Sequence, residues 1–467
     1  MASEQGVEGR QRPLWVNPLF GTADPAFGLK AVLARHKFPD RPNSPATVAR
    51  LIRDELMLDG NPRLNLATFV TTWMEPEAHA LMGDTADKNL IDRDEYPATT
   101  DMERRCVAML ARLWNVPDPE NPVGSSSVGS SEACMLGALA LKRRWAQRNA
   151  DRYPGHARPN LVMGTNAQVC WKKFCNYWEV EPRQVPMEGD RYHLGAEEAA
   201  EACDENTIGV VATLGSTMDG SYEPVAEICG ALDALEDRTG VHVPVHVDAA
   251  SGGMIAPFLE PHLEWDFRLS RVASINTSGH KYGLVYPGIG WVLWRDQEAL
   301  PEELMERVNY LGGEMPTFTL NFSRPGSLVI AQYYNFLRLG HEGYGAVQGT
   351  LREVATYLAG AIEELGCFRL LTRGDELPVF AFTTTNDVTQ FNVFDVSRRL
   401  REYGWLVPAY TFPPNREDLA VLRVVCRNGF SLDLANRLVD DLRDLLPWLQ
   451  RQPGPLYGPQ EASSFHH

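Results

Sequence analysis

Hydrophobic residues in the middle of the chain occur in short runs, each bounded by Gly, Pro, Asp or Ser. Five runs rich in β-branched and other apolar residues predict strands: NLVMG (160–164), IGVVATLG (208–215), HVPVHVDAA (242–250), VASINTS (272–278) and GIGWVLWR (288–295). Segments with helical spacing lie between several of them, for instance Glu132–Trp145 and Pro224–Asp237. This alternation predicts an α/β fold with a doubly wound, mostly parallel sheet covered by helices on both faces.

The two ends of the chain have different patterns. Residues 1–40 are polar and rich in Gly and Pro, which predicts a loosely held arm, and residues 44–58 predict an amphipathic helix with Ser44 as N-cap and Pro45 at its first position. Residues 351–366 predict a long amphipathic helix that leads into a separate α+β pattern. We therefore predict an arm and helix over 1–63, a large domain over 64–351, and a small C-terminal domain with a tail over 352–467.

Composition narrows the class of protein. Of the 467 residues, 44% are hydrophobic and 22% are charged, which is typical of a globular protein, and the net charge of -17 disfavours nucleic acid as a partner. The eight cysteines show no CxxC and no zinc-like spacing, so we expect reduced thiols and no metal site. The first residues have no apolar segment typical of a secretory signal, and no apolar run reaches transmembrane length. We expect a cytoplasmic protein without a membrane span.

Ligands of doubly wound sheets bind beyond the carboxyl ends of the strands. Three stretches at predicted strand or helix ends are therefore candidates for binding a ligand. The first is GSSEA (129–133), where Ser130 and Ser131 open a helix and offer hydroxyl and backbone N–H groups to a phosphate. The alternative is a simple helix cap in which Glu132 favours the helix dipole.

The second stretch is HVDAASGG (246–253), in which Asp248 closes an apolar run. A buried carboxylate needs a cationic partner, and a protonated pyridine nitrogen would be one. The alternative is an Asp that caps a loop.

The third stretch is INTSGHKYGL (275–284), in which Lys281 follows Asp248 by 33 residues, about one strand-helix-strand excursion. Most His-Lys pairs are solvated loop residues. A phosphate cradle with Ser278 and His280, a carboxylate for a pyridinium and a lysine for an aldehyde are together what a protein supplies to pyridoxal 5'-phosphate. In this combination, Lys281 is the candidate anchor of the aldehyde.

Longer strings resemble one family from about residue 37 to the C-terminus. They include ELMLDGNPRLNLATF (55–69), VGSSEACMLG (128–137), EACDENTIGVV (201–211), EWDFRLSRV (264–272), YLGG (310–313) and NFSRP (321–325). The chain resembles the bacterial glutamate decarboxylases, group II pyridoxal-phosphate enzymes of fold type I (aspartate-aminotransferase-like). The resemblance implies decarboxylation of L-glutamate to 4-aminobutyrate, with consumption of a proton, mildly acidic working conditions, and a role in acid resistance or 4-aminobutyrate metabolism.

The resemblance also implies roles for individual residues. Lys281 binds the cofactor covalently, Asp248 holds the pyridinium, and Tyr310 or Lys281 returns the proton to the substrate. The phosphate positions are Ser130, Ser131, Ser278 and His280. Gln168 matches a residue that lies against the cofactor ring, Thr217 matches one near its phenolic oxygen, and His246 is a further cofactor-binding candidate at the strand end of Asp248. Phe322 and Ser323 match a segment that reaches the neighbouring subunit's phosphate. Arg423 matches the ligand of the α-carboxylate, for which the alternative is a surface ion pair. The residues around the distal carboxylate are Thr68, Phe69, Asn89 and Asp92.

Partners and regulation follow from the same resemblance. The active site would require a homodimer, and some family members form hexamers. His467 matches a near-terminal histidine that enters the active site as pH rises, whereas the alternative is a frayed or cloning-derived end. The segment 440–458 is acidic and broken by prolines, so we expect no calmodulin binding.

The chain differs from the family pattern at two positions, and two alternative functions remain open. Lys172 replaces a histidine of the family, and Pro316 stands in the variable part of a lid-like segment. The rival functions are another pyridoxal-phosphate enzyme, such as an aminotransferase or a different decarboxylase, and a non-catalytic transcription regulator. The regulator would need a basic DNA-binding domain that this acidic chain does not show.

Overall fold

The computed structural model describes residues 16–17, 21–22, 37–39, 42–151, 158–308 and 315–459. In strands β1 (Val16–Asn17), β2 (Gly21–Thr22), β10 (Glu306–Val308) and β11 (Met315–Thr317) only the backbone is described. The chain divides into two units, Met1–Gly60 and Asn61–His467. The first unit contains the antiparallel pair β1–β2 and helix α2 (Pro45–Leu56). Ser44 is the N-cap of α2 as predicted, although its side chain makes no capping hydrogen bond.

The second unit is organised around a seven-stranded sheet in the order β3-β9-β8-β7-β6-β4-β5. Strand β9 is antiparallel to both of its neighbours, and the other neighbouring pairs are parallel, so the predicted mostly parallel sheet is confirmed. The strands are β3 (Val123–Ser127), β4 (Asn160–Gly164), β5 (Glu181–Val185), β6 (Thr207–Thr213), β7 (Val245–Asp248), β8 (Val272–Thr277) and β9 (Gly290–Trp294). The predictions missed β3 and β5, because their sequences VGSSS and EPRQV are mostly polar.

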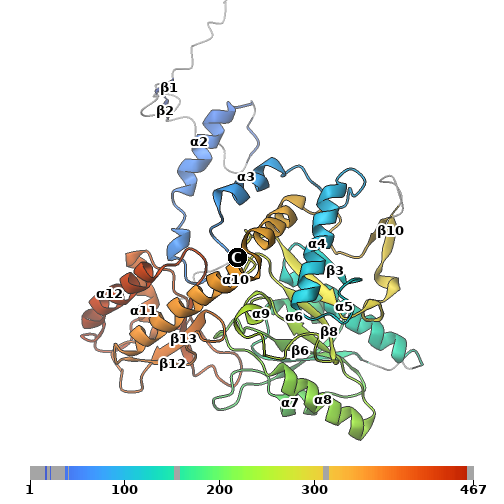
Figure 1. The fold of residues 1–467 in the computed structure, drawn as a ribbon. Helices are drawn as coiled ribbons and strands as arrows, with labels where there is room; N and C mark the ends of the chain where they lie inside the picture. The colour runs from blue at the N-terminus through green and yellow to red at the C-terminus, as the bar shows by residue number, and fades with distance from the viewer. Residues whose placement is uncertain are drawn as a thin grey trace, which may run out of the picture. The chain divides into compact units, whose positions relative to one another are not determined.

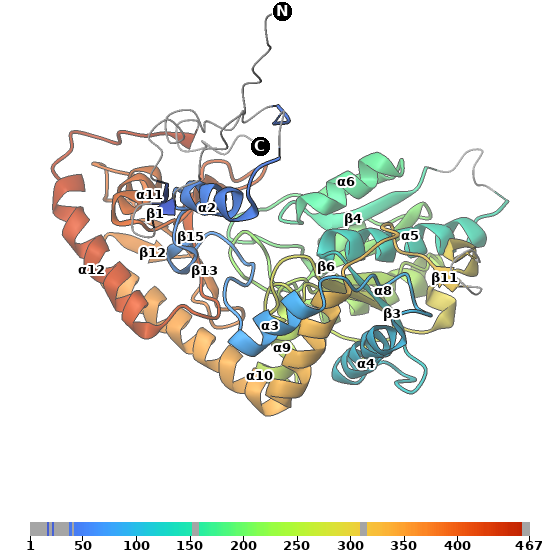
Figure 2. The same ribbon diagram turned by 90° about the horizontal axis from the view of Figure 1, so that it is seen from above.

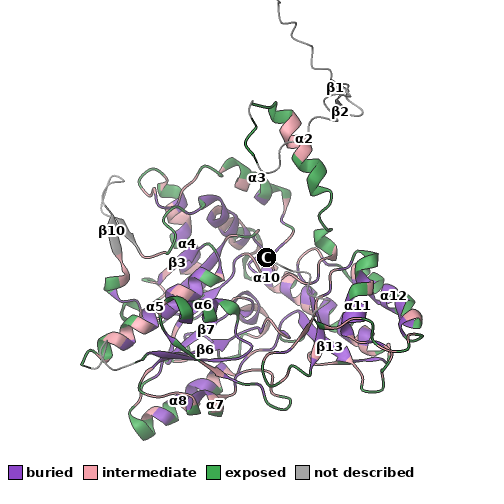
Figure 3. Cartoon of the chain, turned by 180° about the vertical axis from the view of Figure 1, so that it is seen from behind, coloured by how far each residue is buried: buried purple, intermediate pink, exposed green. Residues whose placement is uncertain are grey.

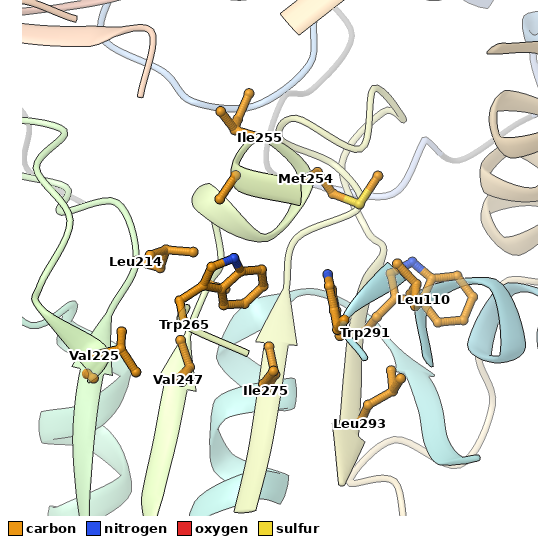
Figure 4. Close-up of a cluster of buried hydrophobic side chains, with 14 of the residues drawn as sticks. Leu110, Leu214, Val225, Val247, Met254, Ile255, Trp265, Ile275, Trp291 and Leu293 are labelled. Atoms are coloured by element: carbon orange, nitrogen blue, oxygen red, sulfur yellow. The ribbon is translucent and has the colours of Figure 1, made fainter. Parts of the chain in front are cut away.

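Helices pack on both faces of this sheet, as the alternation of apolar runs predicts. Along β6, Val210 and Ala212 lie in one core, whereas Ile208 and Val211 lie in another. Figure 4 shows the first core, where Val247 and Ile275 project from adjacent strands. The central strands β6 and β7 are accordingly buried along their whole length (Figure 3). The helices of this region are α3 (Pro76–Asp84), α4 (Pro97–Leu113), α5 (Ser130–Arg148), α6 (Val169–Tyr177), α7 (Ala196–Glu201), α8 (Val225–Thr239) and α9 (Ala256–Leu259).

A smaller antiparallel sheet follows in the order β12-β13-β15-β14. Its strands are β12 (Phe368–Leu370), β13 (Val379–Thr384), β14 (Ala409–Thr411) and β15 (Ala420–Val425), and its helices are α11 (Val393–Leu400) and α12 (Leu432–Leu449). Phe380 and Phe382 of β13 share a core with Leu438 and Leu442 of α12. Short 3-10 helices are η1 (Pro62–Leu64), η2 (Gly252–Met254), η3 (Gln297–Ala299), η4 (Glu302–Leu304) and η5 (Arg401–Tyr403).

The long helix α10 (Gly326–Glu363) connects the two sheets (Figures 1 and 2). It bends at Gly340, whose φ of 57° and ψ of -169° are accessible essentially to glycine alone. Leu351 packs in the core of the large sheet and Val354 in that of the small sheet, so the predicted boundary after residue 351 falls inside one helix. No helix in the described part of the chain has both the length and the hydropathy that a bilayer crossing requires.

Candidate functional site

Strands β3, β4, β6, β7 and β8 end at the same edge of the large sheet, and the residues that follow them surround one cavity. The directions follow from the pairings, since β3 and β8 are both antiparallel to β9. The cavity has a volume of about 270 Å³. Eight of the predicted site residues line it: Ser130, Ser131, Gln168, Thr217, Asp248, Ser278, His280 and Lys281. The structure therefore brings together residues that are up to 151 positions apart in the sequence (281 − 130 = 151).

The start of α5 forms one wall of the cavity. The hydroxyl groups of Ser130 and Ser278 lie 2.6 Å apart, which joins the start of α5 to the end of β8. The carboxylate of Glu132 accepts hydrogen bonds from the backbone N–H groups of Val128, Leu320 and Asn321, so three fixed donors surround its charge. The first N–H groups of α5 and two hydroxyls are thus available to a phosphate.

His280 stands against this wall. A Cβ atom at Gly129 would lie 2.9 Å from Cε1 of His280, and Gly129 has a φ of 145°, so glycine permits the close approach. The backbone N–H of Gly288 donates to Nδ1 of His280 at 3.4 Å, which leaves Nε2 to carry the proton. Burial and the nearby charge of Lys281 lower the pKa of His280 to about 4. His280 is therefore a neutral hydrogen-bond donor in mild acid.

Asp248 is buried at the end of β7 and held by three donors. Its Oδ2 atom accepts from Nε1 of Trp171 at 2.7 Å, and its Oδ1 atom accepts from Nδ2 of Asn276 and from the N–H of Ala250, both at 3.2 Å. These three hydrogen bonds fix both oxygen atoms of the buried side chain. The carboxylate is thus fixed in the cavity wall, ready for a cationic partner.

Asp248 is oriented by a chain of hydrogen bonds behind it. Nε2 of His246 lies 2.8 Å from the amide oxygen of Asn276, and Nδ1 lies 2.7 Å from the hydroxyl of Ser274. Because an amide oxygen only accepts, Nε2 carries the proton and Nδ1 accepts from Ser274. Burial lowers the pKa of His246, which keeps this ring neutral. His246 therefore acts on Asp248 through Asn276, and it is not among the residues that line the cavity.

Lys281 projects from the loop after β8 toward the same carboxylate. Its Nζ atom lies 3.3 Å from Oγ of Ser251 and 5.2 Å from the ring centre of Phe69. Burial lowers the pKa of Lys281, and the charge of Asp248 partly opposes this effect. A lowered pKa increases the fraction of neutral, nucleophilic amine.

Arg423, on β15 of the small sheet, is not among the residues that line the cavity, but it bonds to one of them, Thr217. Its Nη1 atom donates to the carbonyl oxygen of Thr217, and its Nη2 atom donates to that of Ala67 at 2.6 Å. The guanidinium lies 4.8 Å from the ring centre of Phe69 and 5.7 Å from that of Tyr410. Nε of Arg423 is buried without a hydrogen-bond partner among the described residues. An orphaned N–H on a buried cation is a suitable donor for a carboxylate ligand.

These groups fit pyridoxal 5'-phosphate. A helix start with hydroxyls suits a phosphate, a buried carboxylate suits a protonated ring nitrogen, and a lysine with a lowered pKa suits an aldehyde. The glycine at position 129 leaves the room that this arrangement of His280 and α5 requires.

Comparison with known proteins agrees with this geometry. Residues 40–385 match the family described as the pyridoxal-dependent decarboxylase conserved domain. The chain belongs to the pyridoxal-dependent decarboxylases. As a member of this family it uses pyridoxal 5'-phosphate.

Individual relatives are similar over nearly the whole chain. A glutamate decarboxylase of Aliivibrio fischeri is 49% identical, with 97% of each chain covered, and one of Petunia hybrida is 51% identical, with 91% of this chain and 85% of the relative covered. The structure of a Lactobacillus brevis glutamate decarboxylase has a TM-score of 0.88 and 44% identity, with 93% of this chain and 98% of that chain covered. The predicted fold type I architecture of a pyridoxal-dependent decarboxylase is thereby confirmed.

Four residues predicted for the site lie together elsewhere in this decarboxylase chain. Asn89 accepts a hydrogen bond from the N–H of Arg324 at 3.1 Å and donates to the hydroxyl of Ser323 at 3.4 Å. Asp92 follows Asn89 in the same turn, where its N–H donates to the carbonyl oxygen of Asn89. Phe322 and Ser323 are exposed. None of Asn89, Asp92, Phe322 and Ser323 is among the residues that line the Lys281 cavity.

Of the remaining predicted residues, two are described by the structure and three lie in parts of the chain or side chains that it does not describe. Thr68 precedes Phe69, and its hydroxyl accepts from the N–H of Val70 at 3.1 Å. Lys172 is exposed on α6 and is not among the residues that line the cavity. Tyr310 and His467 lie outside the described residues, as does the side chain of Pro316.

Sequence reasoning missed Trp171, Asn276 and Ser251, all of which contact the predicted pair Asp248 and Lys281. Asn276 and Ser251 lie in strings already singled out, INTSGHKYGL and HVDAASGG, but nothing in their spacing indicates a contact. Trp171 follows Gln168 by three residues, and Gln168 caps α6 by accepting from the N–H of Cys170 at 2.6 Å. Recognition of that helix start would have placed Trp171 on the buried face.

Proposed function

We propose that this protein decarboxylates L-glutamate at its α-carbon to give 4-aminobutyrate and carbon dioxide. The observation that carries the proposal is 49% identity to a glutamate decarboxylase over 97% of both chains. The geometry supports it, because Arg423 brings a buried guanidinium with an orphaned N–H beside the cavity of Lys281. Such a cation selects a substrate that carries a carboxylate.

The cofactor is held by residues of the large sheet. Ser130, Ser131, Ser278 and His280 bind the phosphate, Asp248 holds the ring nitrogen, and Gln168 and Thr217 contact the ring and its phenolic oxygen. When bound, pyridoxal 5'-phosphate supplies a sink for the electron pair that departing carbon dioxide leaves behind. Asp248 strengthens this sink, because its fixed carboxylate stabilises a protonated ring nitrogen. Asn276 and His246 keep that carboxylate in place.

Lys281 has two tasks in this proposal. Its amine would bind the aldehyde of the cofactor covalently, and the same amine would carry a proton to the α-carbon of the substrate. Tyr310 is the alternative proton donor. The side chain of Tyr310 lies outside the described residues. The structural support for a proton donor therefore comes only from the contacts of Lys281.

Arg423 orients the substrate. Its two Nη atoms are anchored to the backbone of Thr217 and Ala67, which leaves Nε to bind the α-carboxylate. Phe69, a candidate residue around the distal carboxylate, lies against both Lys281 and Arg423. Thr68 binds near the distal carboxylate.

The reaction consumes one proton. Glutamate has one net negative charge, and 4-aminobutyrate and carbon dioxide have none, so the proton added at the α-carbon balances the equation. We propose that the enzyme works best in mild acid, where the proton that the reaction consumes is readily supplied. Acid resistance and 4-aminobutyrate metabolism are both compatible physiological roles.

We propose a homodimer as the smallest active assembly, with a hexamer as the larger assembly that the family resemblance implies. Asn89, Asp92, Phe322 and Ser323 gather around one exposed segment that is separate from the cavity of their own chain. Their predicted roles require a cavity, and the one in a neighbouring subunit would supply it. Asn89 and Asp92 would then bind the distal carboxylate of a substrate held by the neighbour.

The net charge of the chain and the state of its cysteines support proposals about other partners and about the cellular location. The net charge of -17 argues against nucleic acid, and the acidic helix α12 ends at Leu449, before prolines, which argues against calmodulin. All eight cysteines are unpaired, which supports a cytoplasmic location. We also propose that His467 enters the active site as its imidazole becomes neutral with rising pH.

One experiment tests the function directly. Purified enzyme with pyridoxal 5'-phosphate is mixed with glutamate across a pH series, and carbon dioxide, 4-aminobutyrate and 2-oxo acid are measured together. We expect equal amounts of gas and 4-aminobutyrate, with no 2-oxo acid. Formation of 2-oxo acid without gas would identify an aminotransferase instead, and gas from another amino acid but not from glutamate would identify a different decarboxylase.

A further inference from the structure

Two cysteines flank Asp248 in the wall of the cavity. Cys134 lies on the second turn of α5 and Cys170 near the start of α6, two helices that begin at the same edge of the sheet. The Sγ atoms of both cysteines and a carboxylate oxygen of Asp248 all lie within 4.8 Å of one another. All three residues line the 270 Å³ cavity and are at most 4% exposed.

Two sulfurs and one carboxylate oxygen are a ligand set for a thiophilic divalent cation. Zn²⁺ binds sulfur at about 2.3 Å and carboxylate oxygen at about 2.0–2.2 Å in tetrahedral geometry, so its ligand atoms stand roughly 3.5–3.8 Å apart. The three atoms lie within 4.8 Å of one another, so side-chain movements of about 1 Å are enough to reach this spacing. Trp171 and Asn276 hold the carboxylate of Asp248 from behind, as outer partners do in metal sites.

We propose that, when the cofactor is absent, Cys134, Cys170 and Asp248 bind one Zn²⁺ ion in the cofactor cavity. The two thiols lose their protons to solvent, and the fourth position is left to water. Two thiolates and a carboxylate carry three negative charges, and the bound ion offsets two of them. Lys281 is close enough for its charge to interact with all three ligands.

The ion and the cofactor exclude each other. Asp248 cannot hold both a metal ion and the ring nitrogen, and the ion would fill the part of the cavity that the ring requires. The chain would therefore exist either with pyridoxal 5'-phosphate or with Zn²⁺ at this position. The exclusion rests on the proposed role of Asp248, whereas metal binding itself rests only on the three side chains.

The test uses the full-length chain freed of its cofactor, with CdCl₂ as the spectroscopic probe, because cadmium thiolates have an ultraviolet charge-transfer band. We expect one Cd²⁺ per chain, displaced by ZnCl₂ but not by MgCl₂, since a hard ion prefers oxygen ligands. Cys134→Ser and Cys170→Ser should each weaken binding by about 100-fold or more. Cys175→Ser is the matched control: Cys175 is equally buried on α6 but is not among the residues that line the cavity.

Folding and cofactor competition are checked separately. Uptake of pyridoxal 5'-phosphate, followed by its absorbance, shows that each serine variant retains its cavity. Loading the wild-type chain with pyridoxal 5'-phosphate should abolish the cadmium band. An unchanged band in Cys134→Ser and Cys170→Ser, its absence from the wild type, or its persistence in the loaded enzyme would each overturn the proposal. Gas release by the loaded enzyme is a different readout, so failure of the metal site leaves the proposed decarboxylation intact.

Discussion

Around Lys281, two groups of residues differ in how they are held. In the strand-end cluster, which comprises Ser130, Asp248, Ser278, His280 and Lys281, polar side chains are fixed largely by other side chains, as in the chain from Ser274 through His246 and Asn276 to Asp248. In the Arg423 cluster, which comprises Phe69, Tyr410 and Arg423, the guanidinium is fixed by backbone carbonyl groups of two distant segments and by aromatic faces.

The difference reflects what each cluster must do. In the proposed function the strand-end cluster holds a cofactor that stays bound, and side-chain networks give it a fixed charge pattern. In the proposed function the Arg423 cluster binds a substrate that must enter and leave, and it depends on the packing of the small sheet against the large one. Changes in the first cluster should therefore affect the chemistry and the cofactor together, and changes in the second should affect the substrate alone.

The largest effect is expected for Lys281→Ala. Because nucleophile and proton donor are lost together, turnover should fall by more than about 10³-fold. Carbon dioxide release and the absorbance of the bound cofactor measure both losses. Wild-type turnover in this variant would remove the basis of the proposed function.

Asp248→Asn should lower kcat by about 10²- to 10³-fold, the range for loss of one preorganised electrostatic group. The Michaelis constant for glutamate should change little, because Asp248 does not bind the substrate. Steady-state kinetics separate the two parameters. A raised Michaelis constant with unchanged kcat would mean that Asp248 binds the substrate, and the two clusters would then not differ in their roles.

The neutral state of His280 predicts a pH dependence of stability. Its folded-state pKa of about 4 lies below its ordinary value of 6.5, so the unfolded chain binds more protons between these values. As pH falls from about 6.5 to about 4, the cofactor-free wild type should lose about 2 to 3 kcal/mol of unfolding free energy relative to His280→Gln. Urea unfolding at both pH values measures the difference, and parallel changes in the two proteins would contradict it.

Arg423→Lys should reduce kcat/KM for glutamate by about 10- to 100-fold, because a point charge replaces a planar fork whose charge-assisted hydrogen bonds contribute about 1.5–3 kcal/mol. Cofactor affinity should stay unchanged, which sharpens the contrast with Asp248→Asn. Arg443→Lys is the control, since Arg443 is an exposed residue of the same domain. Equal kinetics in wild type and Arg423→Lys would exclude the proposed role.

The smallest effect concerns the tail. Removal of residues 463–467 should leave activity in mild acid unchanged and extend it toward neutral pH, because a neutral imidazole at position 467 would no longer compete for the site. The pH profile of gas release compares the two forms. Superimposable profiles would mean that the tail has no regulatory role.

The sequence by itself determined the elements with strong local patterns. Five apolar runs became β4, β6, β7, β8 and β9, and the strings around Asp248 and Lys281 were recognisable because each follows a strand of the same sheet. Parallel strands share a carboxyl edge, so order along the chain is enough to place such residues together. The polar strands β3 and β5 had no such pattern, and only pairing with neighbours identifies them.

Only the tertiary structure decided which residues actually meet. It placed His246 behind Asn276, separated Asn89 and Asp92 from the cavity of their own chain, and put Cys134 beside Cys170. These contacts join segments whose distance in sequence carries no information about their distance in space. They depend on how helices pack on the sheet and how the small sheet packs against the large one. For the same reason, the spacing of cysteines along the chain indicated no metal site. The thiols of Cys134 and Cys170 come together only when α5 and α6 both cover one face of the folded sheet.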